Sequence, residues 1–168
     1  MKTNETPIYD QSHNTTGCCP KFNPEGWDDQ KLHFEDKKFL RAVTKSAMHI
    51  PLNMGHVFGR VAEHMEDSAA MTTDDTFILS RDISPWKAEH FFAVSKDVEG
   101  EEMVTLSGDF ITRVFEGPYQ KAKDWEREMR DAAKAQGKDA KEVYFMYTTC
   151  PSCSKAYGEN YLVGVAQI

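Results

Sequence analysis

The 168-residue chain lacks any apolar run close to the roughly 20 residues that span a bilayer, and its first 16 residues lack the hydrophobic core of a signal peptide. It also lacks an excess of basic residues, because 20 Lys and Arg against 27 Asp and Glu give a net charge of −7. Nucleic acids and anionic membranes attract basic surfaces, so neither is an expected partner. No glycine-rich phosphate-binding loop occurs, and neither a nucleotide nor a flavin cofactor is indicated. We expect a cytoplasmic protein.

The composition is that of a globular domain, with 40% hydrophobic and 28% charged residues. A chain of this length is long enough for one well-buried core and short for two. The first 36 residues are rich in Asn, Asp, Thr, Pro and Gly, which predicts an irregular arm packed on the domain. Residues 37–168 form the predicted domain.

The domain is predicted to use one structural unit twice, at about residues 37–98 and 103–168. Each copy begins with a β-branched and aromatic run that ends near a proline, which predicts a strand. A helical pattern follows, and two further short apolar runs complete the copy. The order strand, helix, strand, strand therefore occurs twice, with predicted final strands at 76–82 and 89–98 in the first copy and 142–149 and 161–168 in the second.

Both predicted helices carry an apolar stripe of helical period. The first, within residues 52–71, has Met54, Val57, Phe58, Val61 and Met65 on one face, and the second has Ala122, Trp125, Met129 and Ala133. A sheet with both helices on one face would bury both stripes. The predicted fold class is α+β, an antiparallel sheet with two helices on one face and the irregular arm.

The four cysteines form two close pairs, Cys18 with Cys19 in GCCP and Cys150 with Cys153 in TTCPSC. Cytoplasmic thiols are kept reduced, so close pairs indicate metal ligands before disulfides. Zinc takes four tetrahedral ligands, and a C-x-x-C spacing lets two thiolates reach one ion. A structural zinc site made of these four residues, with His13 as a conceivable substitute for one ligand, would tie the arm to the segment between the last two strands.

Two alternatives to zinc stay open at this stage. The thiols could pack as small hydrophobic groups around a β-turn between the last two strands. They could also form a disulfide or a redox pair, although redox C-x-x-C pairs usually open a helix and this one is predicted to lie in a turn.

The duplicated unit and the FEGPY segment, which turns a strand into a helix, resemble the GyrI-like small-molecule-binding superfamily, also called the bacterial transcription effector-binding domain. The GCCP and TTCPxC segments resemble those of a bacterial subfamily, some of whose members are labelled hydrolase. The resemblance covers residues 37–168. It implies an aromatic ligand groove near the pseudo-twofold axis between the two units, with an acidic residue in it. Many relatives carry that Glu in the last strand, whereas this chain reads NYLVGVAQI there.

The groove residues implied by the resemblance are Tyr119 and Trp125, with Glu89 as the nearest acidic candidate. A carboxylate beside Trp86 in an apolar groove could act as a general base toward water. The Tyr119 hydroxyl, at a helix N-terminus, could stabilise developing negative charge. Aromatic walls and a nearby imidazole complete the predicted ligand site: Trp86, Trp125, Phe91, Tyr144, Tyr147 and His49.

Three functions are consistent with these residues. The first is a stand-alone protein that binds a small aromatic or polycyclic molecule for sequestration or resistance. The second is a hydrolase that adds water to a strained or activated substrate in the same groove, with Glu89 and Tyr119 as catalytic residues. The third is a protein-interaction module stapled by zinc.

Overall fold

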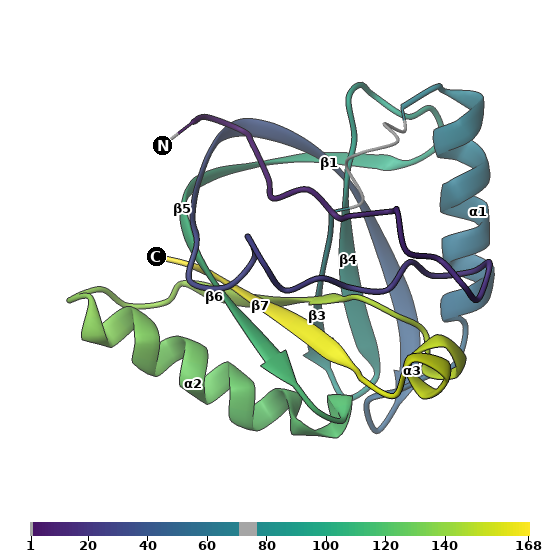
Figure 1. Cartoon of the computed structure of the whole chain (residues 1–168). Coiled ribbons are helices and arrows are strands. Elements are labelled where there is room, and N and C mark those ends of the chain that lie inside the picture. Colours follow the sequence, from purple (N-terminus) through teal and green to yellow (C-terminus); the bar gives the residue numbers. More distant parts are fainter. Residues whose placement is uncertain (1, 71–76) are drawn as a thin grey trace. The chain divides into compact units, whose positions relative to one another are not determined.

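The computed structural model describes residues 2–70 and 77–168 (Figure 1), and the chain divides into two compact units. Unit 1 comprises Met1–Phe34 and Gly108–Ile168, and unit 2 comprises Glu35–Ser107. Two long strands, β1 (Lys31–Ala47) and β5 (Glu102–Glu116), have residues in both units. Met71 and Thr76, at the edges of a predicted helix and a predicted strand, lie outside the described residues.

Unit 2 contains the first copy of the predicted repeat. After β1 come β2 (Ile50–Pro51), α1 (Met54–Asp67), β3 (Ile78–Ser84) and β4 (Lys87–Ala93). β4 pairs antiparallel with β1 on one side and with β3 on the other, and β2 pairs antiparallel with β1. The order strand, helix, strand, strand is confirmed, with the short β2 hairpin as an addition.

The apolar stripe of α1 packs on the strands of unit 2, as predicted. Val57, Val61 and Met65 are buried on this helix. They belong to one core cluster with Leu40 of β1 and Phe92 of β4, where burial of each large side chain contributes roughly 1.5 to 3 kcal/mol. The helical period therefore located both the helix and its buried face.

Unit 1 contains the second copy. β5 leads into a short 3₁₀ turn, η1 (Tyr119–Lys121), and then into α2 (Ala122–Ala135), β6 (Glu142–Tyr147), α3 (Pro151–Tyr157) and β7 (Tyr161–Gln167). β7 pairs antiparallel with both β5 and β6. The α+β class is confirmed, and so is the order strand, helix, strand, strand of the second copy, with α3 as an addition between the last two strands.

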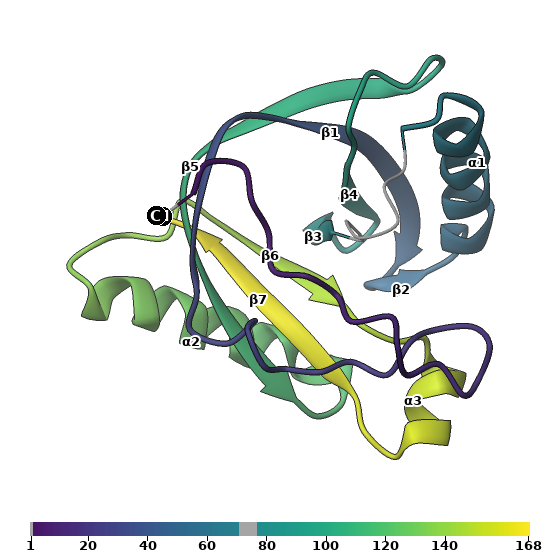
Figure 2. The same ribbon diagram turned by 45° about the horizontal axis from the view of Figure 1, so that its top comes forward.

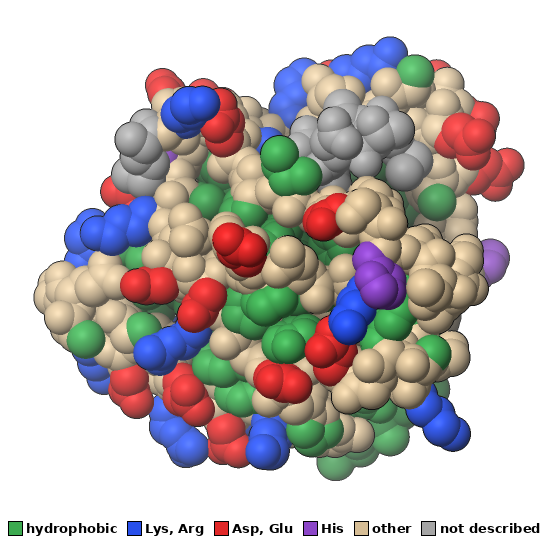
Figure 3. Space-filling view, in the orientation of Figure 1, with side chains coloured by type: hydrophobic (Ala, Val, Ile, Leu, Met, Phe, Trp, Pro, Cys, Tyr) green, Lys and Arg blue, Asp and Glu red, His purple; other side chains and the backbone are tan. Residues whose placement is uncertain are grey.

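α2 covers one face of the β5, β6 and β7 strands, as both ribbon views show (Figures 1 and 2). Trp125, Met129 and Ala133 are its buried residues. The helix lies so close to β7 that a Cβ on Gly164 would come within 2.7 Å of the Met129 sulfur, so this position needs glycine. Acidic and basic side chains lie side by side on the surface in the region of this helix (Figure 3). Within the helix, Arg130 and Glu126 form an ion pair.

The N-terminal arm has no helix between residues 2 and 30, as expected of an irregular segment, whereas residues 31–36 of the predicted arm belong to β1. Three aromatic side chains anchor it in unit 1, because Tyr9, Phe22 and Trp27 are buried and their rings contact one another. The Tyr9 hydroxyl donates a hydrogen bond to the Thr148 carbonyl at 2.7 Å. Residues 10–18, between these anchors, are all exposed.

The segment between β6 and β7 is a helix, so the prediction of a β-turn there is wrong. Pro151 is the first residue of α3, and Gly158 ends the helix with a left-handed φ of +74°. Proline at the first helical position and glycine after the last are typical of helix boundaries. Gly158 N–H also donates to the Ser154 carbonyl at 2.9 Å, which closes the last turn.

Candidate metal centre

Two adjacent cysteines lie on the exposed loop of the arm. Gly17, with a φ of +73°, turns the chain just before Cys18, and its N–H donates to the Asn14 side chain at 2.9 Å. The backbone N–H of Lys21 donates to the His13 carbonyl at 2.7 Å and closes the loop. These bonds hold both Cys18 and Cys19 at the tip of one compact turn.

The other two cysteines belong to α3. Cys150 is the N-cap residue of this helix, and Cys153 lies one turn later with its side chain buried. Residues three apart on a helix share a face, so the two sulfurs point to the same side. The Tyr157 hydroxyl, at the end of the same helix, donates to the Cys19 carbonyl at 2.7 Å and ties α3 to the arm loop.

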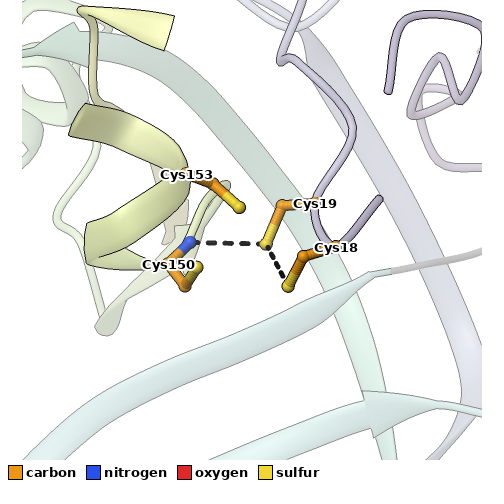
Figure 4. A group of neighbouring side chains, drawn as sticks. All are labelled: Cys18, Cys19, Cys150 and Cys153. Carbon is orange, nitrogen blue, oxygen red and sulfur yellow. Dashed lines mark hydrogen bonds between the residues drawn. The ribbon is translucent and has the colours of Figure 1, made fainter. Parts of the chain in front are cut away.

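The four sulfurs converge within unit 1, where all four Sγ atoms lie within 4.8 Å of one another (Figure 4). The Cys18 and Cys19 sulfurs are 3.7 Å apart. A zinc ion with four Zn–S bonds of about 2.3 Å has S–S edges of about 3.8 Å. All four cysteines are free thiols. The donor set and its spacing therefore fit a tetrahedral, thiolate-bound ion, as the sequence predicted.

Two of the thiols have pKa values shifted in opposite directions. A hydrogen bond from the Ser152 hydroxyl, followed by one from the Cys153 backbone N–H, lowers the pKa of Cys150 to about 6. Burial raises the pKa of Cys19 to about 12. Without a metal ion, Cys150 is therefore a thiolate and Cys19 a thiol at neutral pH, whereas both would be thiolates as zinc ligands.

The sequence pattern of a protein family described as "Bacterial hydrolase" matches residues 9–168. The chain belongs to this family. All four cysteines lie within the matched residues, and so does most of the arm from Tyr9 onward. No curated protein matches the chain. Within residues 2–70 and 77–168 of this family member, no helix is both long enough and apolar enough to cross a membrane.

In this hydrolase-family chain, the predicted general base Glu89 is an ion-paired residue of β4 in unit 2. Its side chain is buried, with one oxygen 2.7 Å from Arg41 Nε and the other hydrogen-bonded to Arg81 Nε. Arg41 also donates to Glu102 at 2.9 Å. Each oxygen of the Glu89 carboxylate therefore accepts a hydrogen bond from a different guanidinium.

The neighbouring His90 points to the opposite face of β4, as strand alternation predicts. Its ring packs edge-on against Phe58 of α1. Its Nδ1 lies 2.7 Å from the Ser80 hydroxyl and its Nε2 2.9 Å from the Thr44 hydroxyl, and all three side chains are buried. Burial lowers the pKa of His90 to about 4, so the ring is neutral at pH 7.

Sequence reasoning missed this hydroxyl–imidazole–hydroxyl group. Ser80 lies directly across from His90 in the β3–β4 pairing. On β1, the residue across from His90 is Ala42, and Thr44 lies two positions further along that strand. Only the strand register brings these residues together, so no spacing in the sequence signals the group. His49 was predicted as a ligand residue, and its Nδ1 lies 2.7 Å from Asp82 in the same unit.

The predicted aromatic ligand residues occupy different environments. Trp86 in unit 2 is 57% exposed, whereas Phe91 of the same unit is buried. In unit 1, Tyr144 is buried in β6, and Tyr147 at the end of that strand is 52% exposed. The ligand site that they would form stays a prediction.

Trp125 and Tyr119, the two residues implied by the family resemblance, also differ in their exposure to solvent. Trp125, a residue of α2, is buried, and its ring stacks on the ring of Phe115 with centroids 5.3 Å apart. Tyr119 is 52% exposed at the start of η1. Trp125 thus contributes to the core of unit 1, and the catalytic role of Tyr119 stays a prediction, as does the resemblance to the effector-binding superfamily.

Proposed function

We propose that this member of the bacterial hydrolase family binds one zinc ion through Cys18, Cys19, Cys150 and Cys153. One observation carries the proposal: four free thiols from segments 131 residues apart lie with all sulfurs within 4.8 Å of one another. Thiolates are soft ligands that favour zinc over magnesium or calcium. A closed site of four protein thiolates supplies folding energy and has no open position for a substrate, so its role is structural.

The surroundings of the sulfurs support a bound ion. Four thiolates on a divalent ion carry a net charge of −2, which N–H and O–H donors stabilise. The Cys150 N–H donates to Cys19 Sγ at 3.5 Å, and the Thr16 hydroxyl lies 3.3 Å from Cys153 Sγ. The Cys150 N–H belongs to the start of α3 and the Thr16 hydroxyl to the arm loop, and both can donate to a sulfur in the thiolate form.

Two disulfides that join the arm to α3 are a weaker fit to this arrangement. A disulfide needs sulfurs about 2.05 Å apart and β-carbons at a specific separation. Cys18 and Cys19 are adjacent in sequence, and each would have to move toward a different residue of α3 while the loop remained tied by Tyr157. A single ion bonds to all four sulfurs near their present separations.

The test is the zinc content of full-length protein purified under reducing conditions without added zinc. About one equivalent per chain is expected, since one ion satisfies four ligands. The double variant Cys18→Ser with Cys19→Ser should lose this zinc, and Ser12→Ala in the same loop is the matched control that should keep it. Less than about half an equivalent in the wild type would overturn the proposal.

Hydrolysis of a small activated substrate is a second candidate function, and it is favoured by membership of the hydrolase family. Two groups in unit 2 carry suitable side chains. Ser80 and His90 form a hydroxyl–imidazole pair at 2.7 Å, the distance at which a base can activate a nucleophile. Glu89, in the same unit, is the residue that the sequence indicated as a general base for water addition.

Turnover of a p-nitrophenyl ester and of an epoxide would test this candidate and assign its residues. Loss of turnover in Ser80→Ala alone would assign the hydroxyl–imidazole pair. Loss of turnover in a Glu89→Gln variant that is shown to remain folded would assign water addition to Glu89. Absence of turnover of both substrates by the wild type, with thermal stabilisation by aromatic compounds, would instead favour the small-molecule-binding function.

A further inference from the structure

One of the four cysteines differs from the others in its accessibility. Cys18 is exposed, whereas Cys19 and Cys150 are half-buried and Cys153 is buried. Cys18 also lies at the tip of the loop formed by residues 10–18, every one of which is exposed. A molecule arriving from solvent therefore meets the Cys18 sulfur before it meets the other three.

The four sulfurs also differ in their hydrogen bonds. Cys19 Sγ accepts from the Cys150 N–H at 3.5 Å, Cys153 Sγ lies 3.3 Å from the Thr16 hydroxyl, and Cys150 Sγ lies 3.5 Å from the Ser152 hydroxyl. Cys18 Sγ contacts Cys19 Sγ, a fellow ligand, at 3.7 Å. In the part of the chain that the structure describes, no N–H or O–H group donates to Cys18 Sγ.

These two differences determine which thiolate reacts. The thiolate is the nucleophilic form of cysteine, and a metal ligand is held in that form at neutral pH. A hydrogen bond stabilises the charge on sulfur and makes its electron pair less available to an electrophile. Cys19 Sγ accepts such a bond, and Cys150 Sγ and Cys153 Sγ each have a hydroxyl within 3.5 Å that can donate to a thiolate. Cys18 is exposed, and its sulfur has neither kind of neighbour among the described residues.

We propose that Cys18, as a ligand of the zinc site, is a nucleophile for soft alkylating electrophiles. This inference rests on the zinc binding proposed above. The structure supplies an electron-rich sulfur at the surface, held in place by the Tyr157 bond to the next residue and by the loop closure at Lys21. The substrate class is a small molecule with an sp³ carbon that bears a good leaving group.

The reaction balances without an oxidant or a second reactant. The Cys18 sulfur donates an electron pair to the carbon, a C–S bond forms, and the bond to the leaving group breaks. The leaving group departs as an anion with its electron pair, and Cys18 becomes a thioether. The net charge of the zinc ion and its four sulfur ligands changes from −2 to −1, and no proton is transferred.

The experiment uses zinc-loaded, full-length protein and a limiting amount of iodoacetamide, followed by proteolysis and mass spectrometry of the cysteine peptides. Peptide fragmentation separates Cys18 from the adjacent Cys19. We expect Cys18 to be modified about tenfold faster than any other cysteine, as a difference in both shielding and access predicts. Zinc content measured on the same sample separates the two proposals.

A sample with a full equivalent of zinc in which Cys18 reacts no faster than the others would overturn this inference and leave zinc binding intact. A sample without zinc would overturn the proposed function itself. A variant that keeps all four ligands provides a second test. Ser152→Ala removes the hydroxyl beside Cys150 and should raise the alkylation rate of Cys150 with no change at Cys18. An alkylation rate of Cys150 that is the same in the variant and in the wild type would contradict the role of hydrogen-bond shielding.

Discussion

The backbone N–H of Cys150 donates to Cys19 Sγ across 3.5 Å, although the two residues are 131 positions apart in the chain. Cys150 is the N-cap of α3, so this N–H has no partner within the helix and is available to a sulfur of the arm. The arm therefore docks at a helix start that needs an acceptor. This contact places the two cysteine pairs in one cluster before any ion is considered.

Removal of zinc with a chelator under reducing conditions should loosen the arm loop without unfolding the protein. Tyr9, Phe22 and Trp27 anchor the arm independently of the cysteines, so the core of unit 1 remains. Loss of roughly 3 kcal/mol of metal-linked stability would lower the thermal midpoint by about 6 to 12 °C in a chain of this size.

Hydrogen exchange provides the local measurement for this prediction. Exchange should accelerate in residues 10–21 and in α3 after chelation, while β5 and β7 stay protected. The double variant Cys18→Ser with Cys19→Ser should already show fast exchange before the chelator is added. Uniform acceleration throughout unit 1 would contradict a local role for the ion.

Cys150 should be the most reactive thiol of the metal-free protein. Its pKa is lowered to about 6, chiefly by the Ser152 hydroxyl, so the thiolate predominates above that pH and is lost as the pH falls through it. The alkylation rate of Cys150 should therefore rise with pH around a midpoint near 6 and level off by pH 7.5. Ser152→Ala should move the midpoint upward, and an unchanged midpoint would contradict the assigned cause.

Glu89→Gln should destabilise unit 2 by about 3 to 5 kcal/mol, because it breaks a buried ion pair and leaves Arg41 and Arg81 without their shared carboxylate. Urea unfolding gives the measurement. Glu102→Gln is the matched control, since this partner of Arg41 is 57% exposed and such pairs contribute less than about 1 kcal/mol. Equal effects of the two substitutions would show that Glu89 is not a buried structural anion.

His90 should make the protein less stable in acid. Burial lowers its pKa to about 4, below the value of 6.5 for an exposed histidine, so the unfolded chain binds the extra proton between these values. Stability should therefore fall as the pH drops from 6.5 to about 4, by roughly 3 kcal/mol for this residue. In His90→Gln this component of the pH dependence should disappear from urea unfolding curves, and an unchanged dependence would assign it to other groups.

The sequence predicted those features that depend on local pattern. The stripes ending in Met65 and Ala133 located α1 and α2 and their buried faces, because a period of 3.6 residues is a direct consequence of helix geometry. The sequence pattern predicts a turn where α3 lies, because seven residues are too few to show a helical period. Pro151 and Gly158 are nevertheless residues typical of the two ends of a helix. The convergence of the two cysteine pairs was predicted from the preference of zinc for four ligands, with no information on the fold.

The environment of Glu89 depends on strand register and could not be predicted. Arg81 lies directly across from Glu89 in the β3–β4 pairing, and Arg41 lies across from Phe91, two positions along β4. Residues two apart on a strand share a face, so both guanidiniums reach one carboxylate. A sequence shows the period of each strand and not the register between strands, which is why the two ion pairs of Glu89 could not be predicted.

X-ray absorption at the zinc edge, on protein purified under reducing conditions, tests the zinc centre most directly. The structure predicts a single shell of four sulfur atoms about 2.3 Å from the metal. This shell should be absent in the double variant Cys18→Ser with Cys19→Ser. Protein without zinc, or zinc surrounded mainly by nitrogen and oxygen, would contradict the four-cysteine site.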